Sequence, residues 1–262
     1  MKYLSLLTLL DPQETVIEST LLRRLQEYGL KHLEEIPHTG WNYVLDQVWV
    51  IKELDSYFRN KELNKLILVE VGCGKLIFNN YLEDTYNTKI IGIDRPQGFC
   101  NPKEFRNVDY FQDFRDLVEI EANSVDVIFW LSSIEHNPVD KIKELFDKSV
   151  RLLRNGGILL ATMAIGKETS WFVPSGKTIL SLDDAEKLFG LCNIYNNYEE
   201  IHHKYRQNIL FLKERYQNRF GHFDDEDPLF IVGGSRTVKL EDNQEINIYS
   251  LVEILLCIQE QV

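Results

Sequence analysis

Cysteine is scarce in this sequence of 262 residues, and so are long apolar runs and positive charge. The four cysteines lie far apart and form no Cys-x-x-Cys pair: Cys73, Cys100, Cys192 and Cys257. A zinc site and a disulfide framework both need closer or regularly spaced cysteines, so neither is expected. We therefore predict reduced thiols in a cytoplasmic protein without a metal site.

Apolar runs are short throughout the chain. None approaches the roughly 20 residues that a bilayer-spanning helix needs, so we predict no membrane partner. The N-terminal segment MKYLSLLTLL resembles a signal peptide, but it ends at Asp11-Pro12 and lacks a small-residue cleavage site. We therefore expect residues 1–10 to be part of the fold.

Basic residues are outnumbered by acidic ones, 29 against 41, which gives a formal net charge of −12. Such a surface repels the phosphate backbone of nucleic acids, although a local basic patch would override the average. The sequence also offers no basic stripe with interleaved aromatic residues. We therefore predict no nucleic-acid partner.

What the sequence does contain is an alternation of apolar runs and helical patterns over residues 66–164. The runs have the composition of central strands in a parallel sheet that is covered on both faces: LILVEV (66–71), KIIGID (89–94), VDVIFWL (125–131) and GILLATMA (157–164). Between the last two, apolar residues from Ile142 to Leu153 trace one helical face before an Asn-Gly-Gly stop. This alternation predicts a Rossmann-like, doubly wound α/β fold.

Two further regions flank or interrupt this alternation. Residues 11–30 and 40–58 carry apolar side chains at helical spacing, which predicts an N-terminal helical cap over residues 1–60. Residues 195–228 are polar, aromatic and helical in pattern. We therefore expect residues 61–262 to form one domain, with a helical insertion at about 195–228.

The stretch LILVEVGCGKLIF places Gly72 and Gly74 where a strand turns into a helix. Backbone N–H groups at such a turn approach a ligand closely. A dinucleotide fingerprint needs a third glycine at position 77, where this chain has Ile77. Glu70 lies two residues before the first glycine, where a carboxylate would repel a pyrophosphate but bind a positive amine. These differences, and the absence of a Tyr-x-x-x-Lys pair, disfavour a nicotinamide enzyme.

Carboxylates also follow the next two predicted strands. Asp94 ends the second strand, where an acidic side chain accepts both hydroxyl groups of a ribose; a solvated strand end is the alternative. Asp113 lies where a third strand should end, beside Phe114, in reach of an adenine ring and its exocyclic amine. Asp109 and Asp116 lie in the same stretch, and only the register favours Asp113.

The segments VEVGCG, IIGID, VDYFQDF, NSVDVIFWLSSIEHNPVDK and LFDKSVRLLRNGGILLATM resemble, in order and spacing, five motifs of the class I S-adenosylmethionine-dependent methyltransferases. The resemblance is greatest to the small-molecule group and covers Leu66 to about Ala164. It implies that S-adenosyl-L-methionine is the cofactor and that ten residues bind it: Glu70, Gly72, Cys73, Gly74, Asp94, Arg95, Asp113, Phe114, Leu131 and Ser132. The chain departs from the pattern at Leu76, where a further glycine is common, and at Val125, where phenylalanine is common.

Two candidate catalytic residues follow the strand at 125–131. Methyl transfer from a sulfonium needs no acid for the leaving group, and it needs a base only if the acceptor must lose a proton. Histidine is the residue type most often used as a general base, and His136 lies just past this strand, so it is a candidate base; Glu135 is a second candidate. A purely local structural role for this Glu-His pair is the alternative. Trp171 and Phe172, after the next strand, either contact the acceptor or pack.

The sequence therefore predicts a cytoplasmic methyltransferase with a seven-stranded, mostly parallel sheet. It would move a methyl group to an oxygen or nitrogen of a small-molecule acceptor, without nucleic acid or membrane, and a homodimer stays open. One alternative is an S-adenosylmethionine-binding protein without transfer activity, as a regulatory or structural subunit. The other, weaker alternative is a nicotinamide-dependent oxidoreductase. No residue identifies the acceptor.

Overall fold

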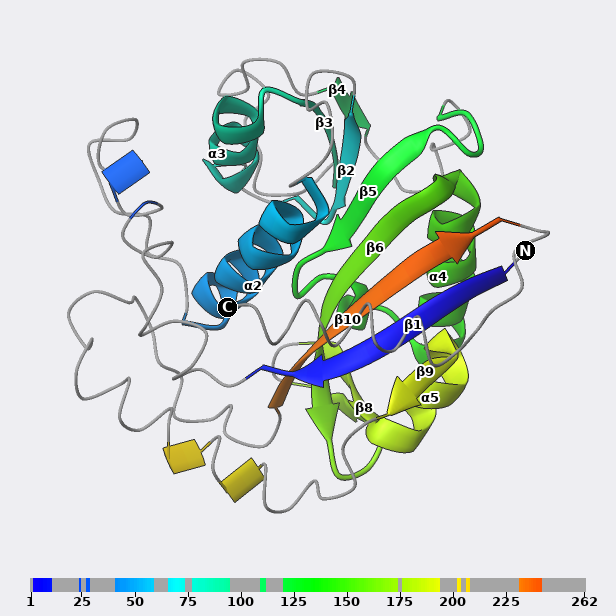
Figure 1. Ribbon diagram of the computed structural model, residues 1–262. Coiled ribbons are helices and arrows are strands. Elements are labelled where there is room, and N and C mark those ends of the chain that lie inside the picture. Colours follow the sequence, from blue (N-terminus) through cyan, green and yellow to red (C-terminus); the bar gives the residue numbers. More distant parts are fainter. Residues whose placement is uncertain are drawn as a thin grey trace.

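The computed structural model describes residues 2–10, 24, 27–28, 41–58, 66–73, 77–94, 109–111, 120–173, 176–193, 202–203, 206–207 and 231–241. Within these residues, one mixed β-sheet of ten strands has helices on both of its faces (Figure 1). The predicted α/β class is therefore confirmed.

Five parallel strands form one half of the sheet, in the order β4 (Asp109–Phe111), β3 (Lys89–Ile93), β2 (Ile67–Val71), β5 (Val125–Trp130) and β6 (Leu153–Gly166). The chain adds strands in one direction from β2 to β4 and in the other direction from β5 to β6. The strand order therefore reverses between β2 and β5. In open α/β sheets, ligands bind outside the carboxyl ends of the strands at such a switch point.

The other half of the sheet is mixed. β10 (Ile231–Leu240) runs antiparallel between β6 and β1 (Lys2–Leu9), and β9 (Leu191–Asn193) lies parallel beside β1. A hairpin of β7 (Ser170–Phe172) and β8 (Lys177–Ser181) pairs with the end of β6. The predicted count of seven strands is wrong for the described part of the chain, because β1, β9 and this hairpin enlarge the sheet.

Residues 2–9 were predicted to belong to a helical cap, but they form the strand β1. Its Ser5 hydroxyl is buried and lies 2.7 Å from that of Thr237 in β10, 232 residues away along the chain. The helical part of the expected cap is α2 (Trp41–Phe58). Most of the helix expected over 11–30, and most of the insertion expected at 195–228, lie outside the described residues.

The other helices are α3 (Ile77–Tyr86), the short helix η5 (Ile134–His136), α4 (Val139–Leu152) and α5 (Leu182–Phe189). Neighbouring residues of β5 show how the long helices are layered. Phe129 contacts the ring of Phe78 on α3, and Trp130 Nε1 donates a hydrogen bond of 3.2 Å to Ser149 on α4. Successive strand residues point to opposite faces, so α3 and α4 cover opposite faces.

Each long helix has a partner on its own face. The Tyr86 hydroxyl of α3 donates a hydrogen bond of 2.6 Å to Asp55 of α2, so α2 lies on the α3 face. The rings of Phe146 in α4 and Phe189 in α5 pack edge to face, 4.9 Å apart, on the other side. None of the helices in the described part of the chain combines the length and the apolar character that crossing a membrane requires.

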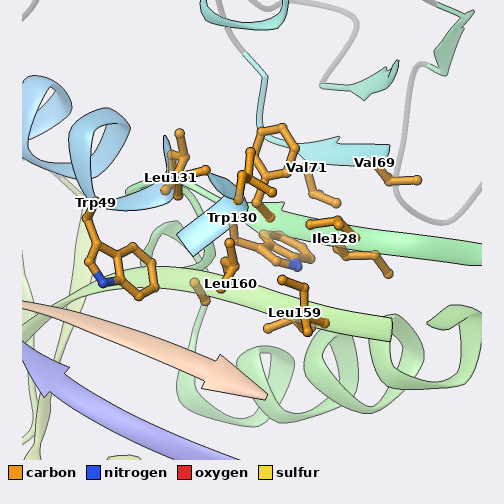
Figure 2. Close-up of a cluster of buried hydrophobic side chains, with 14 of the residues drawn as sticks. Trp49, Val69, Val71, Ile128, Trp130, Leu131, Leu159 and Leu160 are labelled. Carbon is orange, nitrogen blue, oxygen red and sulfur yellow. The ribbon is translucent and has the colours of Figure 1, made fainter. Parts of the chain in front are cut away.

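The core forms around the central strands, where Figure 2 shows side chains of β2, β5 and β6 grouped together and Trp49 of α2 to the left of them. All of them belong to one buried cluster. Both faces of these strands are buried, which explains why their sequences read as continuous apolar runs. The labelled members from the strands are Val69, Val71, Ile128, Trp130, Leu159 and Leu160. This packing fixes the strand ends at which the candidate site lies.

Candidate functional site

The turn after β2 is built around Gly72. Its φ is +78°, and a Cβ there would lie 2.3 Å from the Cβ of Ser133, which follows β5. Its N–H donates a hydrogen bond of 2.7 Å to the Ile93 carbonyl, and the Ser133 hydroxyl donates one of 2.7 Å to the Val71 carbonyl. Only glycine fits this position, so the ends of β2, β3 and β5 meet at the switch point.

Glu70 lies inside this edge of the sheet. Its side chain is buried, and its Oε2 has no hydrogen-bond partner among the described residues. Burial raises the pKa of this carboxyl well above its usual range; the Asn79 amide lowers the pKa in part, and the charge of Asp94 raises it. A buried carboxyl with an unused acceptor oxygen suits a ligand with a positively charged donor.

The other predicted cofactor residues divide into those that the structure describes and those that it does not. Cys73 is buried, and its N–H donates a hydrogen bond of 3.2 Å to the Ile93 carbonyl. Asp94 and Leu131 follow β3 and β5 at the same edge as Glu70. Four predicted residues lie outside the described part: Gly74, Arg95, Asp113 and Phe114. The individual roles of all these residues stay predictions.

Ser132 links the end of β5 to helix α2. It adopts a left-handed backbone conformation with a φ of +44°, and its N–H donates a hydrogen bond of 2.9 Å to the Thr162 hydroxyl of β6. Its own hydroxyl donates a hydrogen bond of 2.5 Å to Oδ2 of Asp46. Asp46 is 0% exposed, and its Oδ1 has no hydrogen-bond partner in the described part of the chain.

Two further charged side chains are buried near Asp46. Glu135 of η5 is 4% exposed, and its Oε2 lacks a hydrogen-bond partner within the described ranges. Lys177, the first residue of β8, is 6% exposed. We call Asp46, Ser132, Glu135, Thr162 and Lys177 the inner cluster.

The carboxyl groups of the inner cluster hold their protons to unusually high pH. Burial raises the pKa of Asp46 to about 7, although the hydroxyls of Ser132 and Thr162 and the charge of Lys177 each lower it. Burial also raises the pKa of Glu135 to about 8; its own backbone N–H lowers this pKa, the Asp46 charge raises it and Lys177 lowers it. Each carboxyl thus changes charge near neutral pH, which is the range in which general bases operate.

His136, next to Glu135 in η5, is exposed rather than buried. Its Nδ1 lies 3.0 Å from the carbonyl oxygen of Gly176, which only accepts hydrogen bonds. In the neutral ring, Nδ1 therefore carries the hydrogen, which leaves Nε2 as the acceptor. The two predicted catalytic candidates thus lie in different environments, one inside the protein and one at its surface.

An open pocket of about 440 Å³ lies beside the β7–β8 hairpin, lined by Pro138, Val139, Thr169, Ser170, Trp171 and Thr178. Trp171 is 49% exposed there, whereas Phe172 packs against Ala164 and Ile179. Because Thr178 and Lys177 are adjacent in a strand, they point to opposite faces, and the pocket lies across β8 from the inner cluster. Across the described ranges, no group of three or more His, Cys, Asp or Glu side chains is placed to hold a metal ion.

Sequence reasoning missed three members of the inner cluster: Asp46, Thr162 and Lys177. Asp46 carried a readable signal, because it is an acidic residue among Leu45, Val48, Trp49 and Val50 in a helix that was expected to pack on the domain. A lone acid on an apolar stripe calls for a buried partner or a ligand. Thr162 and Lys177 carried no comparable signal.

Comparison with protein families gives one match. Residues 69–161, just over a third of the chain, match the model of a methyltransferase domain family. No curated protein sequence matches the chain. The matched segment begins in β2 and ends in β6, so it contains Glu70, the Gly72 turn, Ser132 and Glu135.

Solved structures with a similar fold include three at low sequence identity. Geranyl diphosphate C-methyltransferase from Streptomyces coelicolor A3(2) has a TM-score of 0.53 at 11% identity, with 86% of this chain and 100% of that chain covered. Phosphoethanolamine N-methyltransferase 2 from Haemonchus contortus has a TM-score of 0.50 at 15% identity, with 83% of this chain and 60% of that chain covered. The cyclase SpnF has a TM-score of 0.50 at 12% identity, with 87% of this chain and 96% of that chain covered.

These likenesses concern the fold. The chain spans 53% and 60% of the length of two structures of the Haemonchus contortus enzyme. Together with the family match, they confirm the resemblance to class I methyltransferases that the motifs predicted. The reaction does not follow from the fold, since a cyclase shares it.

Proposed function

We propose that this protein is an S-adenosylmethionine-dependent methyltransferase that acts on an oxygen or nitrogen of a small-molecule acceptor. The observation that carries the proposal is the pairing of the Gly72 turn with the buried, partly unpartnered carboxyl of Glu70. Both lie at the point where the strand order reverses, and both fall within the segment that matches the methyltransferase family model.

S-adenosylmethionine suits the groups at this edge. It carries a methionine ammonium group, which complements the Glu70 carboxylate, and a ribose diol, which complements Asp94 at the end of β3. The Haemonchus contortus enzyme was crystallised with S-adenosyl-L-methionine, and the Streptomyces coelicolor enzyme with S-adenosyl-L-homocysteine. When bound, the cofactor would supply an electrophilic methyl group on sulfur.

The residues of this chain would then position the acceptor and take its proton. Glu135 and His136 are the proposed proton acceptors, and they follow β5 at the same edge as Ser132 and the Gly72 turn. Glu135 is buried in the inner cluster, while His136 is exposed. Positioning in a water-excluded site would supply much of the rate enhancement. The cytoplasmic location remains a proposal from the sequence.

The second candidate function is cofactor binding without methyl transfer. We retain this candidate because the cyclase SpnF has a similar fold, so the fold also serves chemistry other than methyl transfer. The nicotinamide alternative has less support, since Ile77 stands at the start of α3 where a pyrophosphate site needs glycine.

A transfer assay separates these functions. The purified protein is incubated with methyl-labelled S-adenosylmethionine and fractionated pools of small metabolites, and label in new small molecules is measured by mass spectrometry. We expect label in at least one fraction, together with S-adenosylhomocysteine in equal amount. Tight cofactor binding without any label transfer would favour the binding protein, and tight NAD binding in its place would favour the oxidoreductase.

A further inference from the structure

We propose that the methyl acceptor is an amine, which binds as an ammonium ion between Asp46 and Glu135 and loses its proton to one of these carboxylates. This inference rests on the proposed methyltransferase function and names the substrate class of the same site. It starts from the inner cluster, whose two carboxyl groups lie on different elements, α2 and η5, and are buried together with Lys177.

Hydrogen bonding is the first reason. Asp46 Oδ1 and Glu135 Oε2 are both buried and have no hydrogen-bond partner among the described residues. Leaving a buried acceptor unpaired destabilises the folded protein, and the effect is larger when the group is charged. An ammonium group has up to three N–H donors, so it can satisfy both oxygens at once.

Charge balance is the second reason. Lys177 is the described cation whose charge acts on both carboxyl groups, so with all three ionised the inner cluster carries a net charge of 1 − 2 = −1. One monovalent cation neutralises this charge. A carboxylate acceptor would add a third negative charge, and a divalent metal ion would be repelled by Lys177.

The carboxyl groups of the inner cluster also provide the base that an amine requires. An ammonium nitrogen has no free electron pair, so it must first give a proton to Asp46 or Glu135, whose pKa values of about 7 and about 8 suit that role. The neutral nitrogen then attacks the methyl carbon. The new N–C bond forms as the C–S bond breaks, and the electron pair of that bond goes to sulfur, which becomes a neutral thioether. The other charged group that acts on both carboxylates is Lys177 on β8, and the titratable residue next to Glu135 in η5 is His136, which is exposed.

The methionine end of the cofactor also carries an ammonium group, but Glu70 offers that group a separate carboxylate. The charge that raises the pKa of Glu70 is Asp94, whereas the charge that raises the pKa of Glu135 is Asp46. The edge of the sheet therefore holds two pairs of acidic residues: Glu70 and Asp94 at β2 and β3, and Asp46 and Glu135 at α2 and η5. The first suits the cofactor amine, and the second suits an amine of the acceptor.

The test uses simple probes on the full chain. With S-adenosylhomocysteine at saturation, the melting temperature is measured at pH 8 in equal millimolar concentrations of n-butylamine, n-butanol and sodium butyrate. We expect n-butylamine alone to raise the melting temperature, and we expect Asp46→Asn and Glu135→Gln to abolish that rise. Asp140→Asn, an exposed carboxylate on α4, is the matched control and should keep the rise. Equal shifts from all three probes, or an unchanged rise in both variants, would overturn the proposal.

A second measurement separates the two sources of an ammonium group. S-adenosylhomocysteine carries the methionine ammonium and 5′-methylthioadenosine does not, so calorimetric affinities for both are compared in wild type, Asp46→Asn and Glu70→Gln. We expect Glu70→Gln to weaken the binding of S-adenosylhomocysteine by about tenfold, because one charged hydrogen bond is lost, and to leave the binding of 5′-methylthioadenosine unchanged. We expect Asp46→Asn to change neither affinity by more than about twofold. A selective tenfold loss in Asp46→Asn would assign the inner cluster to the cofactor and overturn the acceptor assignment. Failure of the wild type to bind S-adenosylhomocysteine would instead remove the proposed function itself.

Discussion

Charged side chains are buried at both edges of the sheet, but their hydrogen bonds and ion pairs differ between the two edges. At the amino edge, Asp126 accepts a hydrogen bond of 2.9 Å from the Ile67 N–H and pairs with Arg154. Lys239 donates hydrogen bonds of 2.6 Å to Asn123 and to the Leu153 carbonyl. These charges are compensated within the chain, as buried charges in a stable core are.

At the carboxyl edge, three buried carboxyl groups each keep one oxygen without a hydrogen-bond partner in the described part of the chain: Asp46, Glu70 and Glu135. Charged side chains are buried at both edges, so burial alone does not explain the difference. At the amino edge, Asp126 Oδ1 also lacks a hydrogen-bond partner among the described residues, but it is paired with Arg154. Uncompensated groups of this kind cost stability, and they persist where a ligand completes them. We therefore propose that the carboxyl edge is the functional one.

The contrast between the two edges is tested most strongly by replacing a buried aspartate with asparagine at each edge. Asp126→Asn should lower the free energy of unfolding by about 2 kcal/mol, chiefly because it weakens the hydrogen bond that the buried carboxylate accepts from the Ile67 N–H. The loss of the pair with Arg154 adds little, because Arg154 is 41% exposed and solvent screens its charge. Urea unfolding at pH 8 measures this change. A loss below about 0.5 kcal/mol, which is usual for surface substitutions, would show that the amino edge is not held by this carboxylate.

Asp46→Asn should have the opposite sign in the free protein. The pKa of Asp46 is raised from 3.8 to about 7, so the folded state keeps a proton that the unfolded chain has already released. The stability of the wild type therefore falls as pH rises from about 4 to about 7, and Glu135 extends this fall to about 8. At pH 8 the substitution removes an unpaired charge and should raise the free energy of unfolding by about 2 kcal/mol. Urea unfolding from pH 5 to pH 8 should show a shallower decline in the variant; an identical decline would contradict the account.

The cofactor side of the carboxyl edge is tested by Asp94→Ala. The substitution removes a charge-assisted pair of hydrogen bonds to the ribose. It should therefore weaken the binding of S-adenosylhomocysteine by at least about 1.5 kcal/mol, or about tenfold in the dissociation constant. Isothermal titration calorimetry measures the affinity. An unchanged dissociation constant would place the ribose away from the end of β3.

The smallest effect is expected at the surface. His136→Ala should lower turnover less than about threefold, because solvent can take the place of an exposed base while the buried carboxylates of the inner cluster cannot be replaced in that way. Steady-state rates with the identified acceptor measure this effect. A loss of a hundredfold with unchanged cofactor affinity would move the base from Glu135 to His136.

The sequence was sufficient to predict the central half of the fold. The strands β2, β3 and β5 lie within one residue of the runs at 66–71, 89–94 and 125–131, because strands buried on both faces are apolar at most positions. Helix α4 follows the apolar face traced from Ile142 onward. Local pattern and final structure coincide in this segment.

The other half could not be predicted in the same way. The pattern of β1 does not reveal that its partner is β10, more than 200 residues away, since strand pairing is not encoded in the local sequence. The inner cluster was missed for the same reason, because its residues come from four separate segments: residue 46, residues 132 and 135, residue 162 and residue 177. Motifs could indicate the cofactor side, which comes from one contiguous segment, but not the proposed acceptor side.

The most direct test of the central claim is a calorimetric titration of the wild-type protein with S-adenosylhomocysteine, run beside NAD under the same conditions. The account predicts one site per chain with a micromolar dissociation constant, about −8 kcal/mol, for S-adenosylhomocysteine and no heat for NAD. No binding of S-adenosylhomocysteine at millimolar concentration would contradict it.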